Sequence, residues 1–190
     1  MASEQGMAAP AQQNRPSATP VTLPSDSTAV LVLDIGMRAL DSEEAANGLL
    51  EPVSDLLGRA RAKGVYVAYT IMVQDEGTPM GAVATPLTRR EEEPVLYPLG
   101  YDKLRNGELA KLLEARGIEH VIAVGASTHL CVLYTCTAAA RNHGYHVVVP
   151  LDGVAAKNPY EHEYSLHQLT VLPALPIPID FTETALIEFQ

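Results

Sequence analysis

The sequence is short of cysteine, of basic residues and of long apolar runs, and each shortage excludes a class of protein. Only 2 of the 190 residues are cysteines, which excludes a disulfide-stabilised scaffold and indicates a reducing compartment. Lys and Arg number 13 against 23 Asp and Glu, a net charge of −10, which argues against a nucleic-acid partner. No apolar run approaches the roughly 20 residues that span a membrane. We therefore expect a soluble, cytoplasmic, single-domain protein that acts on a small molecule or on another protein.

The first 27 residues differ in composition from the rest of the chain. They consist mainly of Ala, Pro, Gln, Ser and Thr, which have little surface to bury, and they lack the basic start and apolar centre of a secretory signal. We therefore predict a disordered or extended N-terminal arm over 1–27 and a folded domain over 28–190. An arm that packs on a neighbouring subunit is the alternative.

From residue 28 onward, segments with strand and helix character alternate. Strands are predicted at 28–35, 65–70, 94–97, 121–124, 146–150 and 184–189, and helices at 43–63, 107–116, 129–142 and 160–171. Residues 74–94 carry Gly, Pro and charge without a clear period, which indicates a long loop of the kind that is often functional. The alternation is typical of right-handed crossover units and predicts a three-layer α/β/α domain with a parallel sheet.

The carboxyl ends of the predicted strands nominate three places for a ligand, because ligands of parallel sheets bind beyond those ends. Asp34 ends the first strand, the segment 125–131 follows the strand at 121–124, and Asp152 follows the strand at 146–150. Since the sheet brings strand ends into one crevice, Asp34 and Cys131 are expected to lie close together.

Cys131 is the candidate nucleophile. It lies at or just inside the N-terminus of the helix predicted at 129–142, where unpaired backbone N–H groups and the helix dipole favour a thiolate and lower its pKa. The same N–H groups could hold an oxyanion. The alternative is a small buried apolar residue, which is how we interpret Cys136 in the body of that helix.

Asp34 is the candidate general base. It ends an apolar strand, where an unpaired carboxylate would be costly and where burial would raise its pKa. A base near the thiol is the functional interpretation. The alternative is a cap for the following segment or a partner for a buried donor.

Three segments of the sequence resemble a known family. They are LVLDIG at 31–36, ELAKLLEARGIEHVIAVGASTHLCV at 108–132 and GYHVVVPLDGVAA at 144–156. On these segments the chain is identified as a divergent member of the isochorismatase-like cysteine hydrolases. The spacing of glycine, Ser/Thr and cysteine in GASTHLCV is the most specific part of the resemblance.

The resemblance implies a mostly parallel six-stranded sheet that carries a catalytic Asp-Lys-Cys set. Asp34 matches the family aspartate and Cys131 the nucleophile. The peptide between Ala126 and Ser127 matches a non-proline cis bond that shapes the oxyanion site, so the backbone N–H groups of Ser127 and Cys131 would face the oxyanion. The resemblance also implies a homo-oligomer, a dimer or larger.

The lysine of the family set is not in its usual place. Tyr97 stands in the lysine register, and the nearest lysine is Lys103, six residues later. Lys103 could reach the site if the loop folds back, so it is the predicted third catalytic residue, with a surface lysine as the alternative. Tyr97 is predicted to line the substrate pocket together with Ala126, Ser127 and His129.

No metal or other cofactor is predicted. The Asp-His pattern with which nicotinamidases of this family bind metal is absent from 70–77, and the six histidines show no ligand spacing. His129, two residues before Cys131, could line the pocket or pair with the thiol. Its alternative is a residue at a helix start, exposed to solvent or at a subunit interface.

Three functional hypotheses remain open. The first is a cysteine hydrolase that opens a C–N bond in a small amide or imide, with Asp34 as base and Cys131 as nucleophile. The second is a binding or scaffolding protein whose site has decayed at the lysine. The third is an isochorismatase-type vinyl-ether hydrolase that depends on Asp34 and needs no cysteine.

Overall fold

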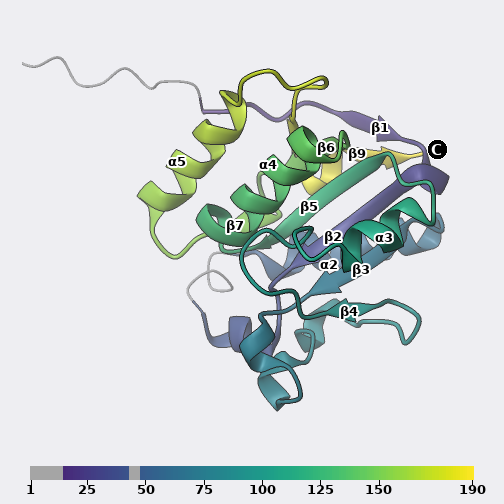
Figure 1. The fold of residues 1–190 in the computed structure, drawn as a ribbon, viewed down its shortest axis with the longest axis vertical. Coiled ribbons are helices and arrows are strands. Elements are labelled where there is room, and N and C mark those ends of the chain that lie inside the picture. Colours follow the sequence, from purple (N-terminus) through teal and green to yellow (C-terminus); the bar gives the residue numbers. More distant parts are fainter. Residues whose placement is uncertain (1–14, 43–47) are drawn as a thin grey trace, which may run out of the picture.

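The computed structural model describes residues 15–42 and 48–190, and these form a mostly parallel sheet flanked by helices (Figure 1). Along the sheet the strands run β4 (Val95–Leu96), β3 (Tyr66–Thr70), β2 (Thr28–Leu33), β5 (His120–Ala126), β6 (His146–Pro150) and β8 (Asp180–Thr182), with β7 (Val154–Ala155) beside β5. The helices are α2 (Leu50–Ala62), α3 (Glu108–Glu114), α4 (Leu133–Asn142) and α5 (Pro159–Thr170). The predicted α/β fold class is therefore confirmed. No helix in the described part of the chain is long and apolar enough to cross a membrane.

The helices cover both faces of the sheet. Alternate residues of β2 enter two separate apolar clusters. Leu31 belongs to the cluster that also contains residues of α3, α4 and α5, whereas Val32 belongs to the cluster that contains residues of α2. Figure 1 shows α3 and α4 on the near side of the sheet and the fainter α2 beyond it. Every residue of β2 is buried, which explains its continuous apolar sequence.

Helix α2 shows why these segments become helices. Its buried residues recur at helical spacing, as Val53, Leu56, Leu57 and Ala60. Gly64, at φ +74°, follows its end and adopts the left-handed conformation that ends many helices. Helix α2 begins at Leu50. Residues 43–47 of the predicted helix lie outside the described part of the chain.

The predicted last strand at 184–189 is wrong as a strand of the main sheet. The edge position next to β6 belongs to β8, and residues 184–186 form a 3-10 turn before β9 (Ile187–Phe189). The carboxylate of Asp152 accepts hydrogen bonds from the backbone N–H and the hydroxyl of Thr184, both at 2.7 Å. These bonds hold the turn that lies between β8 of the main sheet and β9.

Part of the predicted arm belongs to the folded domain. Strand β1 (Val21–Leu23) pairs in parallel with β9 in a separate two-stranded sheet, and its side chains alternate between buried Val21 and Leu23 and exposed Thr22. An apolar-polar alternation of this kind is typical of a half-buried strand, but three residues are too few to stand out in a polar segment. Residues 1–14 of the predicted arm lie outside the described residues.

Replacing Leu23 by alanine is expected to destabilise the domain by about 2–4 kcal/mol, the range for truncating a buried leucine. Leu23 is 1% exposed and packs in the cluster that contains α2. The free energy of unfolding from urea titration measures the effect, and Thr22→Ala, at an exposed position of the same strand, is the matched control. Equal stability of the two variants would contradict the packing of β1.

Candidate active site

A pocket of about 190 Å³ lies at the carboxyl ends of β2, β3 and β5. It is lined by the residue after β2, Asp34, by Ile71 after β3 and by Ala126 at the end of β5, together with Ser127 and Cys131. This is where ligands bind in parallel α/β sheets. The volume is below the roughly 300–1,000 Å³ of pockets for drug-sized ligands, which favours a small ligand.

Asp34 is held at the end of β2 by its backbone. Its N–H donates to the carbonyl oxygen of Thr70 at 2.8 Å, and its φ of +57° is a left-handed conformation that aspartate tolerates better than most residues. Its side chain is 11% exposed. Oxygen Oδ1 has no hydrogen-bond partner among the described residues, which is unusual for a buried carboxylate and leaves that oxygen able to accept a proton.

Lys103 lies beside Asp34, with Nζ 2.7 Å from Oδ2 of the carboxylate. The side chain of Lys103 is 1% exposed, so the alternative of a surface lysine is wrong. The lysine reaches the site because its loop is fastened to α4. The backbone N–H of Lys103 donates to the hydroxyl of Thr135 at 3.1 Å, and that hydroxyl donates to the carbonyl of Tyr101 at 3.1 Å.

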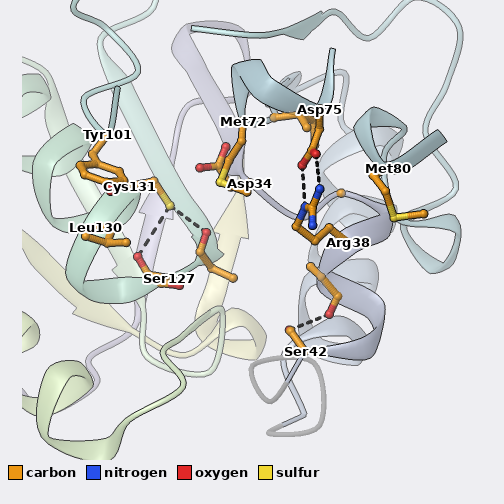
Figure 2. Close-up of a pocket in the computed structure, with 14 residues that line it drawn as sticks. Asp34, Arg38, Ser42, Met72, Asp75, Met80, Tyr101, Ser127, Leu130 and Cys131 are labelled. Carbon is orange, nitrogen blue, oxygen red and sulfur yellow. Dashed lines mark hydrogen bonds and ion pairs between the residues drawn. The ribbon is translucent and has the colours of Figure 1, made fainter. Parts of the chain in front are cut away.

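Cys131 lies in a π-helical turn, Thr128–Val132, that leads directly into α4. Its thiol donates to the carbonyl oxygen of Ala126 at 2.8 Å, and Sγ is 3.6 Å from the carbonyl oxygen of Ser127 (Figure 2). The residue is 1% exposed and lines the pocket. The nucleophile candidate and the base candidate therefore lie in the same crevice.

The electrostatic environment differs in part from the expectation. Burial raises the pKa of Asp34, as predicted, while the Lys103 ammonium opposes that rise. The expected lowering of the Cys131 pKa is wrong. Burial raises the pKa of this thiol well above its ordinary value, and the charge of Asp34 raises it further. The thiol is almost fully enclosed, so desolvation raises its pKa by more than the N–H groups at the helix start lower it.

The chain between β5 and the π-helical turn contains the expected cis peptide, between Ala126 and Ser127. The preceding Gly125 lies against β2, where a Cβ atom would come within 2.4 Å of the carbonyl oxygen of Leu33. Only glycine fits so close to the neighbouring strand. This close approach brings the turn that carries Cys131 next to the end of the strand that carries Asp34.

Two residues predicted for the pocket lie elsewhere. The hydroxyl of Tyr97 donates to the carbonyl oxygen of Gly81 at 3.0 Å, so this side chain fastens the long loop and does not line the pocket. His129 points to α5, with Nδ1 3.6 Å from Oε2 of Glu161, and it is also absent from the lining. Both lie close in sequence to pocket residues, but their side chains contact Gly81 and Glu161.

No sequence pattern singles out the pair formed by Arg38 and Asp75, which lines the far part of the pocket. Nε of Arg38 donates to Oδ2 of Asp75 at 2.9 Å and Nη2 donates to Oδ1 at 2.5 Å. These bonds lower the pKa of Asp75. The one available signal was the position of Asp75 in the long loop at 74–94.

The described residues contain no group of three or more His, Cys, Asp and Glu side chains placed to hold a metal ion. Asp75 lies within the segment 70–77, which lacks an Asp-His pattern. Both of its carboxylate oxygens accept hydrogen bonds from Arg38.

Comparison with known proteins identifies a family over most of the chain. The sequence model of the isochorismatase domain matches residues 28–179. A curated relative, the maleamate amidohydrolase of Pseudomonas putida, is 28% identical over 108 residues, which are 56% of this chain and 50% of the relative. The chain therefore spans about half the length of the curated relative that it matches.

Solved structures share the fold at low sequence identity. A cysteine hydrolase from Pseudomonas syringae pv. phaseolicola superposes with a TM-score of 0.73 and 21% identity, covering 91% of this chain and 95% of the other. The nicotinamidase of Staphylococcus aureus superposes with a TM-score of 0.70 and 20% identity, covering 83% and 99%. At this identity the similarity supports the fold.

Proposed function

The chain belongs to the isochorismatase family, and on that premise we propose that it is a hydrolase that cleaves the C–N bond of a small amide or imide with Cys131 as nucleophile. Asp34 is the general base in this proposal, and Lys103 holds the aspartate in place. The names of two similar proteins, an amidohydrolase and a nicotinamidase, support the class of reaction.

The observation that carries the proposal is the contact between Lys103 and Asp34, 2.7 Å apart. Lys103 lies behind Asp34, and Asp34 and Cys131 line the same pocket. A buried ammonium beside a buried carboxylate opposes the rise in pKa that desolvation causes, and so favours the ionised carboxylate. An ionised Asp34 is needed to take a proton from the thiol. In this proposal Lys103 is the positively charged partner that Asp34 needs in the Asp-Lys-Cys set, although Lys103 does not stand at the position of the family lysine.

The first half of the reaction forms an acyl-enzyme. Because burial raises the pKa of Cys131, the resting thiol is protonated, and Asp34 accepts its proton as Sγ attacks the carbonyl carbon of the amide. The oxyanion of the tetrahedral intermediate is stabilised by the backbone N–H groups of Ser127 and Cys131. Asp34 then gives the proton to the nitrogen, the C–N bond breaks, and an amine or ammonia leaves.

The second half releases the acid. Asp34, ionised again, takes a proton from a water molecule while the water oxygen attacks the thioester carbonyl. Collapse of this second intermediate breaks the C–S bond, and the proton returns to the sulfur. The products are a carboxylic acid and the free thiol.

A binding or scaffolding protein was the rival hypothesis because Tyr97 occupies the lysine register. Its support weakens because a different lysine, Lys103, pairs with Asp34. The vinyl-ether hydrolase hypothesis uses Asp34 alone, and Cys131 in the same pocket favours the cysteine mechanism over it.

A panel of small primary amides and cyclic imides tests the proposal. We expect release of ammonia or ring opening for at least one compound, and an acyl adduct on the peptide that contains Cys131 after acid quenching, detected by mass spectrometry. Turnover without an adduct, and with full activity after alkylation of Cys131, would contradict the cysteine mechanism.

Asp34→Asn is expected to lower kcat by about 10²- to 10⁴-fold, the usual contribution of a general base, with little change in KM. In the unchanged protein, activity is lost as the pH falls through the pKa of Asp34. Because burial raises that pKa, the acidic limb of the kcat/KM profile lies above the range of an ordinary aspartate.

Asp55→Asn is the matched control for this variant, because Asp55 is an exposed carboxylate on α2. It should keep full activity and the same pH profile. An acidic limb at the ordinary aspartate position, or a kcat for Asp34→Asn within threefold of the parent protein, would contradict the role of Asp34 as base.

A further inference from the structure

We propose that the substrates of this site carry a carboxylate in addition to the scissile amide, and that Arg38 binds this carboxylate. The inference rests on the proposed hydrolase function and specifies its substrate class. It is carried by the geometry of the Arg38–Asp75 pair and by the place of that pair in the pocket.

Asp75 fixes the orientation of Arg38 and leaves donors of the guanidinium available. A guanidinium has five N–H donors. The single N–H of Nε and one N–H of Nη2 donate to the two oxygens of Asp75. No described residue accepts from Nη1, so the Nη1–Nη2 edge remains for a ligand. This edge matches the two oxygens of a carboxylate.

The exposure of the two side chains shows which of them a ligand in the pocket can contact. The side chain of Asp75 is 3% exposed, whereas that of Arg38 is 56% exposed. Both carboxylate oxygens of Asp75 are already hydrogen-bonded to Arg38. The pair therefore presents N–H donors to a ligand and keeps its acceptors covered, although its two formal charges cancel.

Arg38 lines the pocket on the side away from Cys131. Figure 2 shows Arg38, Asp75 and Met80 on one side of the pocket and Cys131 on the other, with Asp34 and Met72 between them. The charge of Asp75 contributes to the raised pKa of Asp34, so the pair is within electrostatic range of the base. A short carbon chain with an amide at one end and a carboxylate at the other fits this arrangement.

A matched pair of compounds tests the inference: succinamate, with an amide and a carboxylate, and succinamide, in which the carboxylate is replaced by a second amide. We expect the protein to prefer succinamate by about 10- to 100-fold in kcat/KM, the size expected for hydrogen bonds to a charged group. Arg38→Met should remove the preference, mainly through a higher KM for succinamate. Equal rates for the two compounds, or a preference that survives Arg38→Met, would overturn the inference.

A double variant separates ligand binding from a structural role. Arg38→Met leaves the buried carboxylate of Asp75 without its partner, so the loop itself could shift. Arg38→Met/Asp75→Asn removes both charges. If Arg38 binds substrate, the preference stays lost in the double variant even where thermal stability recovers. Recovery of the preference together with stability would show that Arg38 only holds the loop, and would overturn the inference.

A binding measurement distinguishes failure of this inference from failure of the proposed function. If the protein cleaves neither compound, calorimetry measures the binding of succinate, a dicarboxylate with no amide to hydrolyse. This measurement shows whether the carboxylate site exists. Binding that is lost in both Arg38 variants supports the carboxylate site although these amides are not hydrolysed. Absence of succinate binding overturns it, whatever the hydrolase activity on other amides.

Discussion

Cys131→Ala is expected to lower kcat for amide hydrolysis by about 10⁴- to 10⁶-fold, the range seen when a covalent nucleophile is removed. The variant lacks the sulfur that forms the acyl-enzyme, and no described residue in the pocket offers another thiol. Cys136→Ala is the matched control. Cys136 is equally buried, at 1% exposure on the same helical segment, but does not line the pocket. Similar losses for both variants would indicate damage to folding, and a fully active Cys131→Ala would contradict the proposed mechanism.

The thiol itself gives a second readout. Burial raises the pKa of Cys131 and the charge of Asp34 raises it further. Alkylation of this thiol without substrate is therefore expected to be slow at neutral pH and to accelerate as the pH rises. Asp34→Asn removes the neighbouring negative charge and should make alkylation at a given pH faster, while hydrolysis is lost. If Asp34→Asn is labelled faster and yet turns over more slowly, then Asp34 is needed to accept the proton and not to lower the pKa of the thiol.

The fold was predictable where burial patterns are long and regular. The continuous apolar run of β2 and the helical spacing of α2 placed strand and helix correctly, because each pattern spans several residues of one element. The C-terminal error has a different cause. Residues 184–189 have the composition of a strand, but 184–186 form a turn in which Thr184 bonds to Asp152, and 187–189 pair with β1. Both partners are distant in sequence.

The candidate site was predictable at its strand ends and not in its loops. Asp34 and Cys131 follow β2 and β5, whose register the sheet determines, so the crevice between them follows from topology. The position of Lys103 depends on Thr135 of α4, and the position of Arg38 depends on Asp75. Contacts between a loop and a distant residue leave no periodic signal. The predicted homo-oligomer stays a prediction.

Lys103→Met is expected to reduce both stability and activity. The methionine has a similar length, but it leaves the carboxylate of Asp34, 11% exposed, without its positive partner. Breaking a buried ion pair on one side typically costs about 3–5 kcal/mol. Hydrolysis should fall by about 10²-fold or more, because loss of the ammonium raises the pKa of Asp34 and leaves less ionised base. Urea unfolding and kcat/KM measure the two effects, and Lys111→Met on α3, outside the pocket, is the control.

The pH dependence of that stability loss identifies its cause. In Lys103→Met the folded-state pKa of Asp34 lies further above its unfolded value, because the ammonium that lowered it is gone. Below the unfolded pKa the carboxyl is protonated in both states and carries no penalty. As the pH rises through the folded pKa toward neutrality, ionisation favours the unfolded chain, so the loss should grow from acidic to neutral pH. Adding Asp34→Asn removes the ionisable group, and the double variant should regain stability and show no such pH dependence, but not regain activity. A loss that is constant with pH, and unchanged in the double variant, would show that Lys103 stabilises the domain through packing of its stem and not through Asp34.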